Sequence, residues 1–241
     1  MRLLVTRPEP DATRQAEALA ARGHQPVLAS LLNIEPTSAT PLGLDGAQAL
    51  IVTSRNALRA LASHPDLAAA RVIPLFAVGD ATAKAASELG FTKMIVGPGT
   101  GDSLARLIAD TLSPNAGVLV HLSGETVAFD LKLALAAKGF TMRQNILYRA
   151  VATTTLPKNA AALLEAGKLD GVILMSPRTA AIFVDLVSRQ GAATQASRLD
   201  CYCLSAAVAQ AIGALKGRTI VAARPSEEEL LALIDSAAAS S

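Results

Sequence analysis

An apolar run that ends at a hydroxyl residue and restarts as a helix occurs twice in this chain, and it constrains the fold more than any other feature. The two copies are Ala49-Leu50-Ile51-Val52-Thr53-Ser54-Arg55-Asn56-Ala57 and Gly171-Val172-Ile173-Leu174-Met175-Ser176-Pro177-Arg178-Thr179-Ala180. An apolar run of this length is typical of a strand buried on both faces, and a serine before a helical pattern is typical of an N-cap. The copies lie about half of the 241-residue chain apart, which indicates a duplicated chain.

Apolar runs and helical patterns alternate along the rest of the chain. We expect strands at residues 3–6, 27–29, 50–53, 75–78, 94–96, 118–122, 140–151, 172–175, 201–204 and 219–222. We expect helices at residues 11–22, 54–63, 80–89, 102–112, 127–138, 159–165, 177–188 and 206–215, and a last helix after the capping box at 226–229. Strict alternation requires parallel strands joined by crossover helices.

The duplication extends beyond the opening motif. Residues 76–83 correspond to 202–209, Ile95 to Val221, and residues 3–6 to 118–121. Four strand–helix units therefore occur twice. The length fits one large or two ordinary domains, and the repeats favour two similar α/β domains. The proline- and glycine-rich stretch at 31–46 and the long stretch at 140–151 are predicted to connect them.

The composition excludes several classes of protein. The net charge is only +2, the sequence contains no cluster of basic residues, and aromatic residues make up only 3%. These features argue against nucleic-acid binding. The apolar runs are too short to span a membrane, and the N-terminal one is too short for a signal peptide. We therefore expect a soluble, cytoplasmic protein.

The residues that most often bind metals or act as nucleophiles form no recognisable site. Cys201 and Cys203 alternate in one apolar run, which predicts core residues, and no metal is expected. His24 and His64 are expected at the surface and His121 at a strand end. Neither G-x-G-x-x-G, nor a P-loop, nor G-x-S-x-G occurs in the sequence.

Hydroxyl residues and glycines follow most of the predicted strands. In a parallel sheet these positions lie at the ligand-binding edge, where helix N-termini offer free N–H groups. Arginines nearby are suited to pair with an anion. Each position alone is better explained as an ordinary N-cap, and it is the whole set that predicts an anion site. The candidates are Thr6, Thr53, Ser54, Gly79, Asp80, the segment 97–101, Ser123, Gly124, Ser176, Ser205 and Arg224, with Arg7, Arg55, Arg149 and Arg178.

Several motifs together resemble the uroporphyrinogen-III synthase family: Leu4-Val5-Thr6-Arg7-Pro8, Ile51-Val52-Thr53-Ser54-Arg55-Asn56-Ala57, Phe76-Ala77-Val78-Gly79 with Thr82-Ala83, and Ile146-Leu147-Tyr148-Arg149. The resemblance implies a cofactor-free, monomeric enzyme of tetrapyrrole synthesis. Its substrate is linear hydroxymethylbilane, which it closes into uroporphyrinogen III with inversion of the last pyrrole ring and loss of water.

The resemblance also implies the domain organisation. It predicts two parallel-sheet, flavodoxin-like α/β domains joined by a two-stranded connector. One domain is formed by residues 1–34 and 152–241 and the other by 38–146, with connectors at about 31–46 and 144–155.

By the same resemblance, Tyr148 is the candidate catalytic residue, and a structural tyrosine in the connector is the alternative. Thr53, Ser54, Gly79, Thr82, Ser123 and Ser176 match substrate-binding positions. The chain departs from the family at Ser205-Ala206-Ala207-Val208, where a Gly-Pro-Thr-Thr-like turn is common, so Ser205 is the hydroxyl left there. Alternatives to the enzyme are a non-catalytic two-lobed protein that binds a small polyanion, and a paralogue that has lost catalysis.

Overall fold

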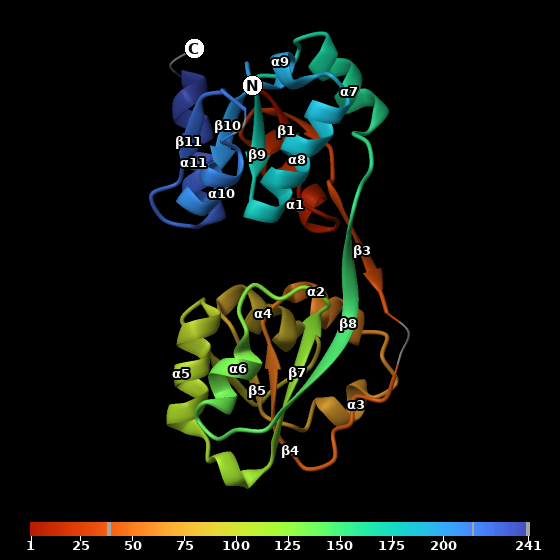
Figure 1. Cartoon of the computed structure of the whole chain (residues 1–241), viewed down its shortest axis with the longest axis vertical. Coiled ribbons are helices and arrows are strands. Elements are labelled where there is room, and N and C mark those ends of the chain that lie inside the picture. The colour runs from red at the N-terminus through yellow and green to blue at the C-terminus, as the bar shows by residue number, and fades with distance from the viewer. Residues whose placement is uncertain (38–39, 214, 240–241) are drawn as a thin grey trace. The chain divides into compact units, whose positions relative to one another are not determined.

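The chain forms two compact units, described here from a computed structural model that covers residues 1–37, 40–213 and 215–239 (Figure 1). Unit 1 comprises Met1–Asn33 and Val151–Ser241, and unit 2 comprises Ile34–Ala150. The predicted domains include positions 38, 240 and 241. The predicted first connector includes position 39, and the predicted helix at 206–215 includes position 214. These positions lie outside the described residues.

Unit 1 contains a five-stranded parallel sheet in the order β11-β10-β9-β1-β2. Numbered along the unit, this is the flavodoxin-like order 2-1-3-4-5. Its elements are β1 (Arg2–Val5), α1 (Asp11–Ala21), β2 (Gln25–Leu28), α7 (Lys158–Glu165), β9 (Gly171–Leu174), α8 (Pro177–Arg189), α9 (Ala193–Ala196), β10 (Asp200–Cys203), α10 (Ala206–Ala211), β11 (Thr219–Val221) and α11 (Glu227–Ala239).

Unit 2 contains a six-stranded sheet in the order β3-β8-β7-β4-β5-β6, in which β8 through β6 are parallel. The strands β3 (Leu32–Pro36) and β8 (Met142–Ala152) lie where the chain passes from one unit to the other. The remaining elements are β4 (Ala47–Val52), α2 (Arg55–Leu61), α3 (Leu67–Ala70), β5 (Leu75–Ala77), α4 (Asp80–Glu88), β6 (Met94–Val96), α5 (Gly101–Thr111), a 3-10 helix (Pro114–Ala116), β7 (Val118–Gly124) and α6 (Leu131–Ala136).

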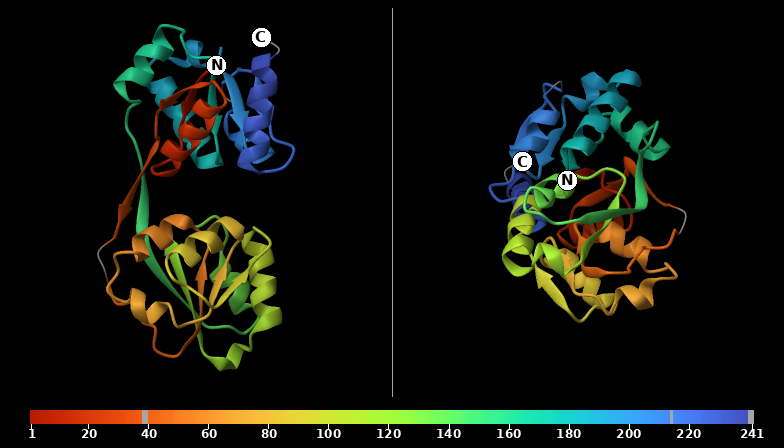
Figure 2. Two further views of the ribbon diagram at one scale, coloured as in Figure 1. Left: turned by 180° about the vertical axis from the view of Figure 1, so that it is seen from behind. Right: turned by 60° about the horizontal axis from the view of Figure 1, so that its bottom comes forward.

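Each sheet is covered by helices on both faces, because alternate residues of its buried strands face opposite sides (Figure 2). In unit 2, Leu50 and Val52 face α2 and α4, whereas Ile51 faces α5 and α6. In unit 1, Leu4 lies in the core with α7 and α8, whereas Leu3 lies in the core with α1 and α11. The predicted α/β class with parallel sheets is therefore confirmed.

The predicted duplication is visible in the strand order. The first half of the chain gives β1 and β2 to unit 1 and β4–β6 to unit 2, and the second half gives β7 and β8 to unit 2 and β9–β11 to unit 1. The orders β2-β1-β9-β10-β11 and β8-β7-β4-β5-β6 correspond strand by strand. Each unit is thus assembled from parts of both repeats.

The strand registers correct two of the predicted residue correspondences. Val5 pairs with Ile173 and His121 pairs with Ile51, so Val5 rather than Thr6 corresponds to His121. By the same reasoning, Ile95 corresponds to Ile220 rather than to Val221. Both predictions are wrong by one residue, because apolar runs of similar composition do not fix their own register.

Some predicted elements also differ. The helix expected at 127–138 begins only at Leu131, the turn expected at 123–125 is partly strand, since β7 continues to Gly124, and the short helices α3 and α9 were not predicted. His24 and His64 are 7% and 8% exposed rather than at the surface, since Asp235 binds one ring and the Thr40 carbonyl the other.

The expectation that the two cysteines are core residues holds. Cys201 and Cys203 are fully buried in one core, and burial raises the pKa of Cys201 to about 12 and that of Cys203 to about 11. Within the ranges that the structure covers, no group of three metal-binding side chains comes together. None of the helices in those ranges has the length and apolar character needed to cross a membrane.

Candidate active site

A cavity of about 540 Å³ lies in unit 2 at the carboxyl ends of β4 and β7. Chain order runs from β4 to β6 on one side of this point and from β7 to β8 on the other, which makes it the switch point where parallel α/β sheets bind ligands. The lining residues are Thr53, Ser54, Val78, Gly99, Thr100, Gly101, Asp102, Gly124, Thr126, Val127, Ala128, Phe129, Leu131 and Tyr148. The predicted site residues Thr53, Ser54, Gly124 and Tyr148 therefore meet in one cavity, together with residues 99–101 of the predicted segment 97–101.

An irregularity in β8 turns Tyr148 towards this cavity. The β7–β8 register pairs Ser123 with Ile146 but Gly124 with Tyr148, so one residue of β8 is skipped. As a result, Leu147 and Tyr148 contribute to the same core cluster, which strict strand alternation would prevent. A Cβ atom on Gly124 would lie 2.6 Å from Cζ of Tyr148, so only glycine leaves room for the ring.

The Tyr148 hydroxyl donates a hydrogen bond of 3.0 Å to Oγ of Ser54. Ser54 is also the N-cap of α2, and its Oγ accepts from the backbone N–H of Asn56 at 3.1 Å, as the sequence predicts. Two donors thus use both lone pairs of this oxygen, which leaves the hydroxyl proton of Ser54 available to a ligand.

Thr53, which lines the cavity, is within hydrogen-bond distance of a buried histidine. Oγ1 of Thr53 lies 3.2 Å from Nε2 of His121, which is 2% exposed. Burial lowers the pKa of His121 to about 4, so the ring is neutral at physiological pH. His121 was predicted only as a strand-end residue.

The late start of α6 forms one wall of the cavity. Asp130 is the N-cap, and its carboxylate accepts from the N–H of Leu133 at 2.9 Å. The segment before it, from Thr126 to Phe129, is not helical and lines the cavity. Phe129 packs on Gly101, where a Cβ atom would lie 2.6 Å from Cβ of Phe129.

The other predicted residues of unit 2 do not line this cavity. Gly79 is the N-cap of α4, and Thr82 in the same helix is buried. Ser123 is 1% exposed, and its hydroxyl donates a hydrogen bond to the carbonyl of Gly124 and accepts one from the side chain of Gln144. The chain itself therefore uses this hydroxyl both as a donor and as an acceptor. Arg55 is half-buried at the first position of α2.

The predicted residues of unit 1 lie at the carboxyl edge of its sheet. The buried Thr6 hydroxyl donates to the Ile173 carbonyl at 2.6 Å. Ser176 is the N-cap of α8 as predicted and accepts from the N–H of Thr179, and Arg178 is exposed in that helix's first turn. Ser205 occupies the N-cap position of α10 but makes no capping hydrogen bond with its side chain.

Three of the predicted arginines already bind carboxylates of the chain. Arg7 lies 2.9 Å from Glu227 and 3.5 Å from Asp11, and its side chain is only 12% exposed. Arg149 lies 3.7 Å from Glu35, and Arg224 lies 3.0 Å from Glu229. An anionic ligand would have to displace or share these carboxylates.

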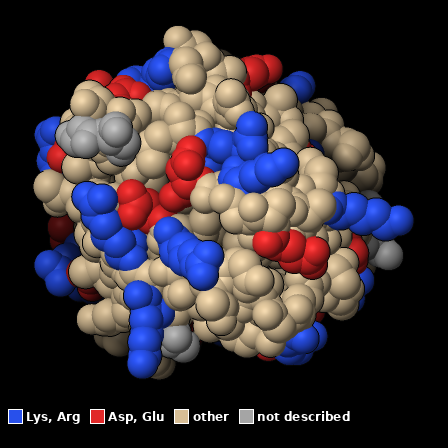
Figure 3. Space-filling view, turned by 90° about the horizontal axis from the view of Figure 1, so that it is seen from above, with Lys and Arg blue, Asp and Glu red and all other residues tan. Residues whose placement is uncertain are grey.

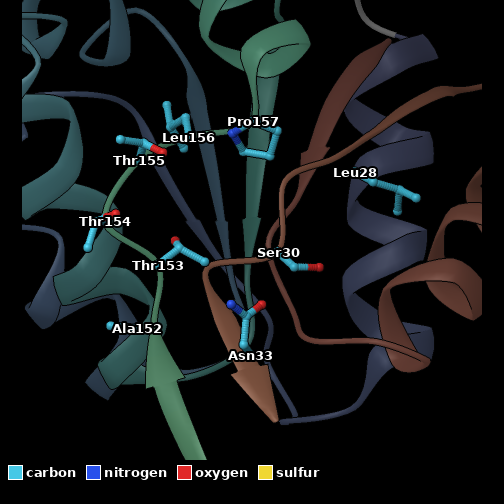
Figure 4. A pocket seen from close by; sticks show the side chains of 9 residues that line it. All are labelled: Leu28, Ser30, Asn33, Ala152, Thr153, Thr154, Thr155, Leu156 and Pro157. Atoms are coloured by element: carbon cyan, nitrogen blue, oxygen red, sulfur yellow. The ribbon is translucent and has the colours of Figure 1, made fainter. Parts of the chain in front are cut away.

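A second hollow, of about 520 Å³, lies in unit 1 where the chain leaves and re-enters that unit (Figure 4). The two segments run side by side, since the N–H of Thr153 donates to the carbonyl of Leu31 at 3.1 Å. Hydroxyls of Ser30 and of residues 153–155 and the amide of Asn33 supply its polar side-chain atoms, and none of its nine lining residues carries a charge. It resembles the unit 2 cavity in its hydroxyls but has no aromatic residue.

Charge is distributed evenly on the face of the molecule in Figure 3. Lys and Arg side chains there are interspersed with Asp and Glu rather than gathered into a stripe. This distribution agrees with the net charge of +2 and offers no extended basic surface on that face.

Sequence reasoning missed His121 and Phe129 as parts of the site, whereas Gly101 belongs to the predicted segment 97–101. Phe129 carried a usable signal, because it is one of five phenylalanines and lies in the first turn of the helix predicted after the strand at 118–122, where an aromatic residue lies near the ligand edge. The contact between Gly101 and Phe129 had no local signal.

The sequence and the structure were compared with known proteins. A search of curated proteins gave no match. The structure is similar to a uroporphyrinogen-III synthetase from Helicobacter pylori, with a TM-score of 0.67, 18% identity and 98% of each chain covered. It is also similar to a mutant uroporphyrinogen III synthase from Thermus thermophilus, with a TM-score of 0.61, 18% identity, and 99% of this chain and 98% of the other covered. The family model described as uroporphyrinogen-III synthase matches residues 13–232. Because that match spans nearly the whole sequence, this chain belongs to the uroporphyrinogen-III synthase family.

Proposed function

We propose that this chain closes hydroxymethylbilane into uroporphyrinogen III and that Tyr148 and Ser54 assist the loss of water. The observation that carries the residue assignment is the hydrogen bond from the Tyr148 phenol to Ser54 at the edge of the unit 2 cavity. It places two hydroxyl groups in series, with the serine proton available to the leaving hydroxyl of the substrate.

The chemical step needs a proton at the leaving oxygen. As the C–O bond of the hydroxymethyl group breaks, its electron pair departs with the oxygen. The oxygen takes a proton from Ser54, which regains one from Tyr148, so an azafulvenium cation and a phenolate remain. The substituted carbon of the last pyrrole attacks this cation to give the spiro intermediate. The older bond from that carbon to its methylene bridge then breaks and re-forms at the free α-carbon of the same ring. The proton lost from the α-carbon restores the phenol, so one water is released and the enzyme is unchanged.

Holding the substrate folded supplies much of the expected rate. The last ring must meet its substituted carbon rather than the free position, and a bound geometry that aligns them replaces an improbable encounter in solution. The substrate carries an acetate and a propionate on each pyrrole. We propose that the Thr53 hydroxyl binds a carboxylate in unit 2, while Ser54 serves the leaving hydroxyl, and that Ser176, Arg178 and Ser205 bind carboxylates in unit 1, where Arg178 is exposed.

Other predicted positions contribute through the backbone or through exchange of partners. Gly79 and Gly124 offer amide groups near the ends of strands, and Arg55 adds a positive charge at the start of α2. Thr82 is proposed only to shape the edge, because its N–H donates to the Gly79 carbonyl at 3.0 Å. Thr6, Arg7 and Ser123 are proposed only as residues that shape the edge, because the chain itself binds their polar atoms.

The decisive experiment incubates the purified protein with freshly prepared hydroxymethylbilane and separates the oxidised isomers by chromatography. We expect isomer III in excess over the isomer I that forms spontaneously. Isomer I alone would contradict the proposal, and retention of the bilane without turnover would instead favour a non-catalytic polyanion-binding protein or an inactive paralogue.

We further propose that the protein works as a cytoplasmic monomer that binds no nucleic acid. The dispersed charge supports this proposal. Light scattering after size-exclusion chromatography tests it, since a monomer has the 24.7 kDa mass of one chain. A mass of two chains, or co-elution with added RNA, would contradict it.

A further inference from the structure

We propose that His121 is a positioning residue, which orients the Thr53 hydroxyl so that its proton points into the unit 2 cavity for a substrate carboxylate. This inference rests on the function proposed above, and it assigns a purpose to a buried polar residue that the dehydration step does not use.

The two side chains lie on one face of the sheet. The β4–β7 register pairs His121 with Ile51, and Thr53 is two residues further along β4, which makes Thr53 the diagonal neighbour of the histidine. The 3.2 Å separation between Nε2 and Oγ1 is a hydrogen-bond distance. Thr53 lines the cavity, whereas the 2% exposed His121 lies behind it.

The surroundings of the ring favour one tautomer. A neutral imidazole carries a single N–H. In the part of the chain that the structure describes, Thr53 is the hydrogen-bond partner of this ring, and Nδ1 has none. Among backbone groups, an N–H without an acceptor is rarer than a C=O without a donor, and we extend this preference to the imidazole ring. The proton therefore belongs on Nε2, which donates to Oγ1 and leaves the threonine proton for a ligand.

Unit 1 provides an internal control for this interpretation. At the corresponding positions it has Val5 and Met175, since Val5 pairs with Ile173 and Met175 lies two residues beyond. Val5 is fully buried, so an apolar residue satisfies the packing of such a sheet. The polar pair, His121 and Thr53, occurs in unit 2, beside the cavity. The apolar pair, Val5 and Met175, occurs in unit 1, where Gln15, Glu227 and Arg7 interact at the position that corresponds to the cavity.

The kinetic test compares His121→Val, Thr53→Val, the double variant and His121→Gln, whose amide nitrogen can stand in for Nε2–H. We expect each Val variant to raise KM about tenfold with little change in kcat, because Thr53→Val removes the hydroxyl that binds a carboxylate and His121→Val removes the group that orients it. The double variant should be no worse than either single variant, and His121→Gln should restore most of the loss. Met175→Leu in unit 1 is the matched control and should keep the wild-type KM.

A spectroscopic test does not depend on activity. Two-dimensional ¹H–¹⁵N spectra that distinguish histidine tautomers should show the Nε2–H form of His121 in the wild-type protein. An Nδ1–H tautomer would overturn the inference, as would multiplicative effects in the double variant or a wild-type KM in His121→Val. Should the wild-type protein make isomer I alone, the proposed function fails, and the tautomer still decides how Thr53 is oriented.

Discussion

The two units have corresponding strands, but the carboxyl edges of their sheets differ. The edge of unit 2 holds the cavity of about 540 Å³ at the ends of β4 and β7, whereas Arg7, Gln15 and Glu227 interact at the corresponding place in unit 1. In unit 1, α1 begins at Asp11, which corresponds to Val127, whereas α6 of unit 2 begins at Leu131, about one turn later. The missing turn leaves the segment from Thr126 to Phe129 unwound along the cavity. A single helical turn therefore separates an open site from a closed one.

Side chains also fill the corresponding place in unit 1. α5 and α11 bury residues at matching positions, so Gly101 corresponds to Glu227. The Glu227 carboxylate binds Arg7 at 2.9 Å and Gln15 at 3.1 Å, and the amide of Gln15 also contacts the sulfur of Met175. Gly101 lacks a side chain and receives the Phe129 ring instead. Duplication supplied two similar edges, and these substitutions made one a binding site and the other a packed support.

The most severe test transplants the helix start of unit 1 into unit 2. Thr126→Pro, Val127→Asp, Phe129→Thr and Asp130→Arg reproduce the sequence of residues 10–14, since Ala12 and Ala128 already agree. We expect α6 to start one turn earlier and fill the cavity, with formation of uroporphyrinogen III falling on the order of 10³-fold. A crystal structure and the isomer assay measure the two effects.

Phe129→Leu is the control for that graft, because it keeps an apolar wall and should retain most activity. A grafted protein with an extended α6 and normal turnover would show that the cavity is not the site.

Tyr148→Phe removes the phenol while keeping its ring against Gly124. We expect kcat to fall on the order of 10²-fold, the usual contribution of a general acid, with an unchanged melting temperature. Tyr202→Phe in unit 1 is the matched control, since the chain has only two tyrosines and Tyr202 is buried in the other unit. Undiminished turnover of Tyr148→Phe would remove the phenol from the mechanism.

His121 makes the stability of unit 2 depend on pH in a way that Val5 cannot in unit 1. Its folded pKa of about 4 lies below the unfolded value of 6.5, so the unfolded chain binds more protons between these values. The stabilisation is complete above the unfolded pKa and is lost as the pH falls towards the folded one. We expect the loss of this stabilisation to lower the free energy of unfolding by about 2 kcal/mol when the pH falls from 8 to 5.

Urea unfolding of wild-type protein and His121→Val across this pH range isolates that contribution. The variant should lose about this much less stability on acidification. Parallel pH profiles for the two proteins would mean that the histidine is not buried in its neutral form.

The contrast between the units also explains what could be predicted from the sequence. The N-caps Ser54 and Ser176 were predictable because the serine and the helix that it caps are adjacent. The start of α6 was not, because the apolar spacing from Val127 favours a helix, while Asp130 caps a shorter one and Phe129 finds its place on Gly101. Arg7 looked available for an anion because its partner Glu227 is 220 positions away in the sequence. Local signals define the elements, whereas long-range contacts decide which edge stays open.

The smallest expected effect concerns the ion pair that closes the unit 1 edge. We expect Arg7→Met to lower the free energy of unfolding by about 1 kcal/mol, because the pair with Glu227 is partly buried and Gln15 depends on the same carboxylate. The KM for hydroxymethylbilane should stay unchanged if the arginine serves this network. Arg189→Met, which breaks the exposed pair with Asp185 in the same unit, is the control and should change stability less. A raised KM with unaltered stability in Arg7→Met would mean that this arginine leaves Glu227 for the substrate, and the edge of unit 1 would then bind carboxylates by exchanging its own.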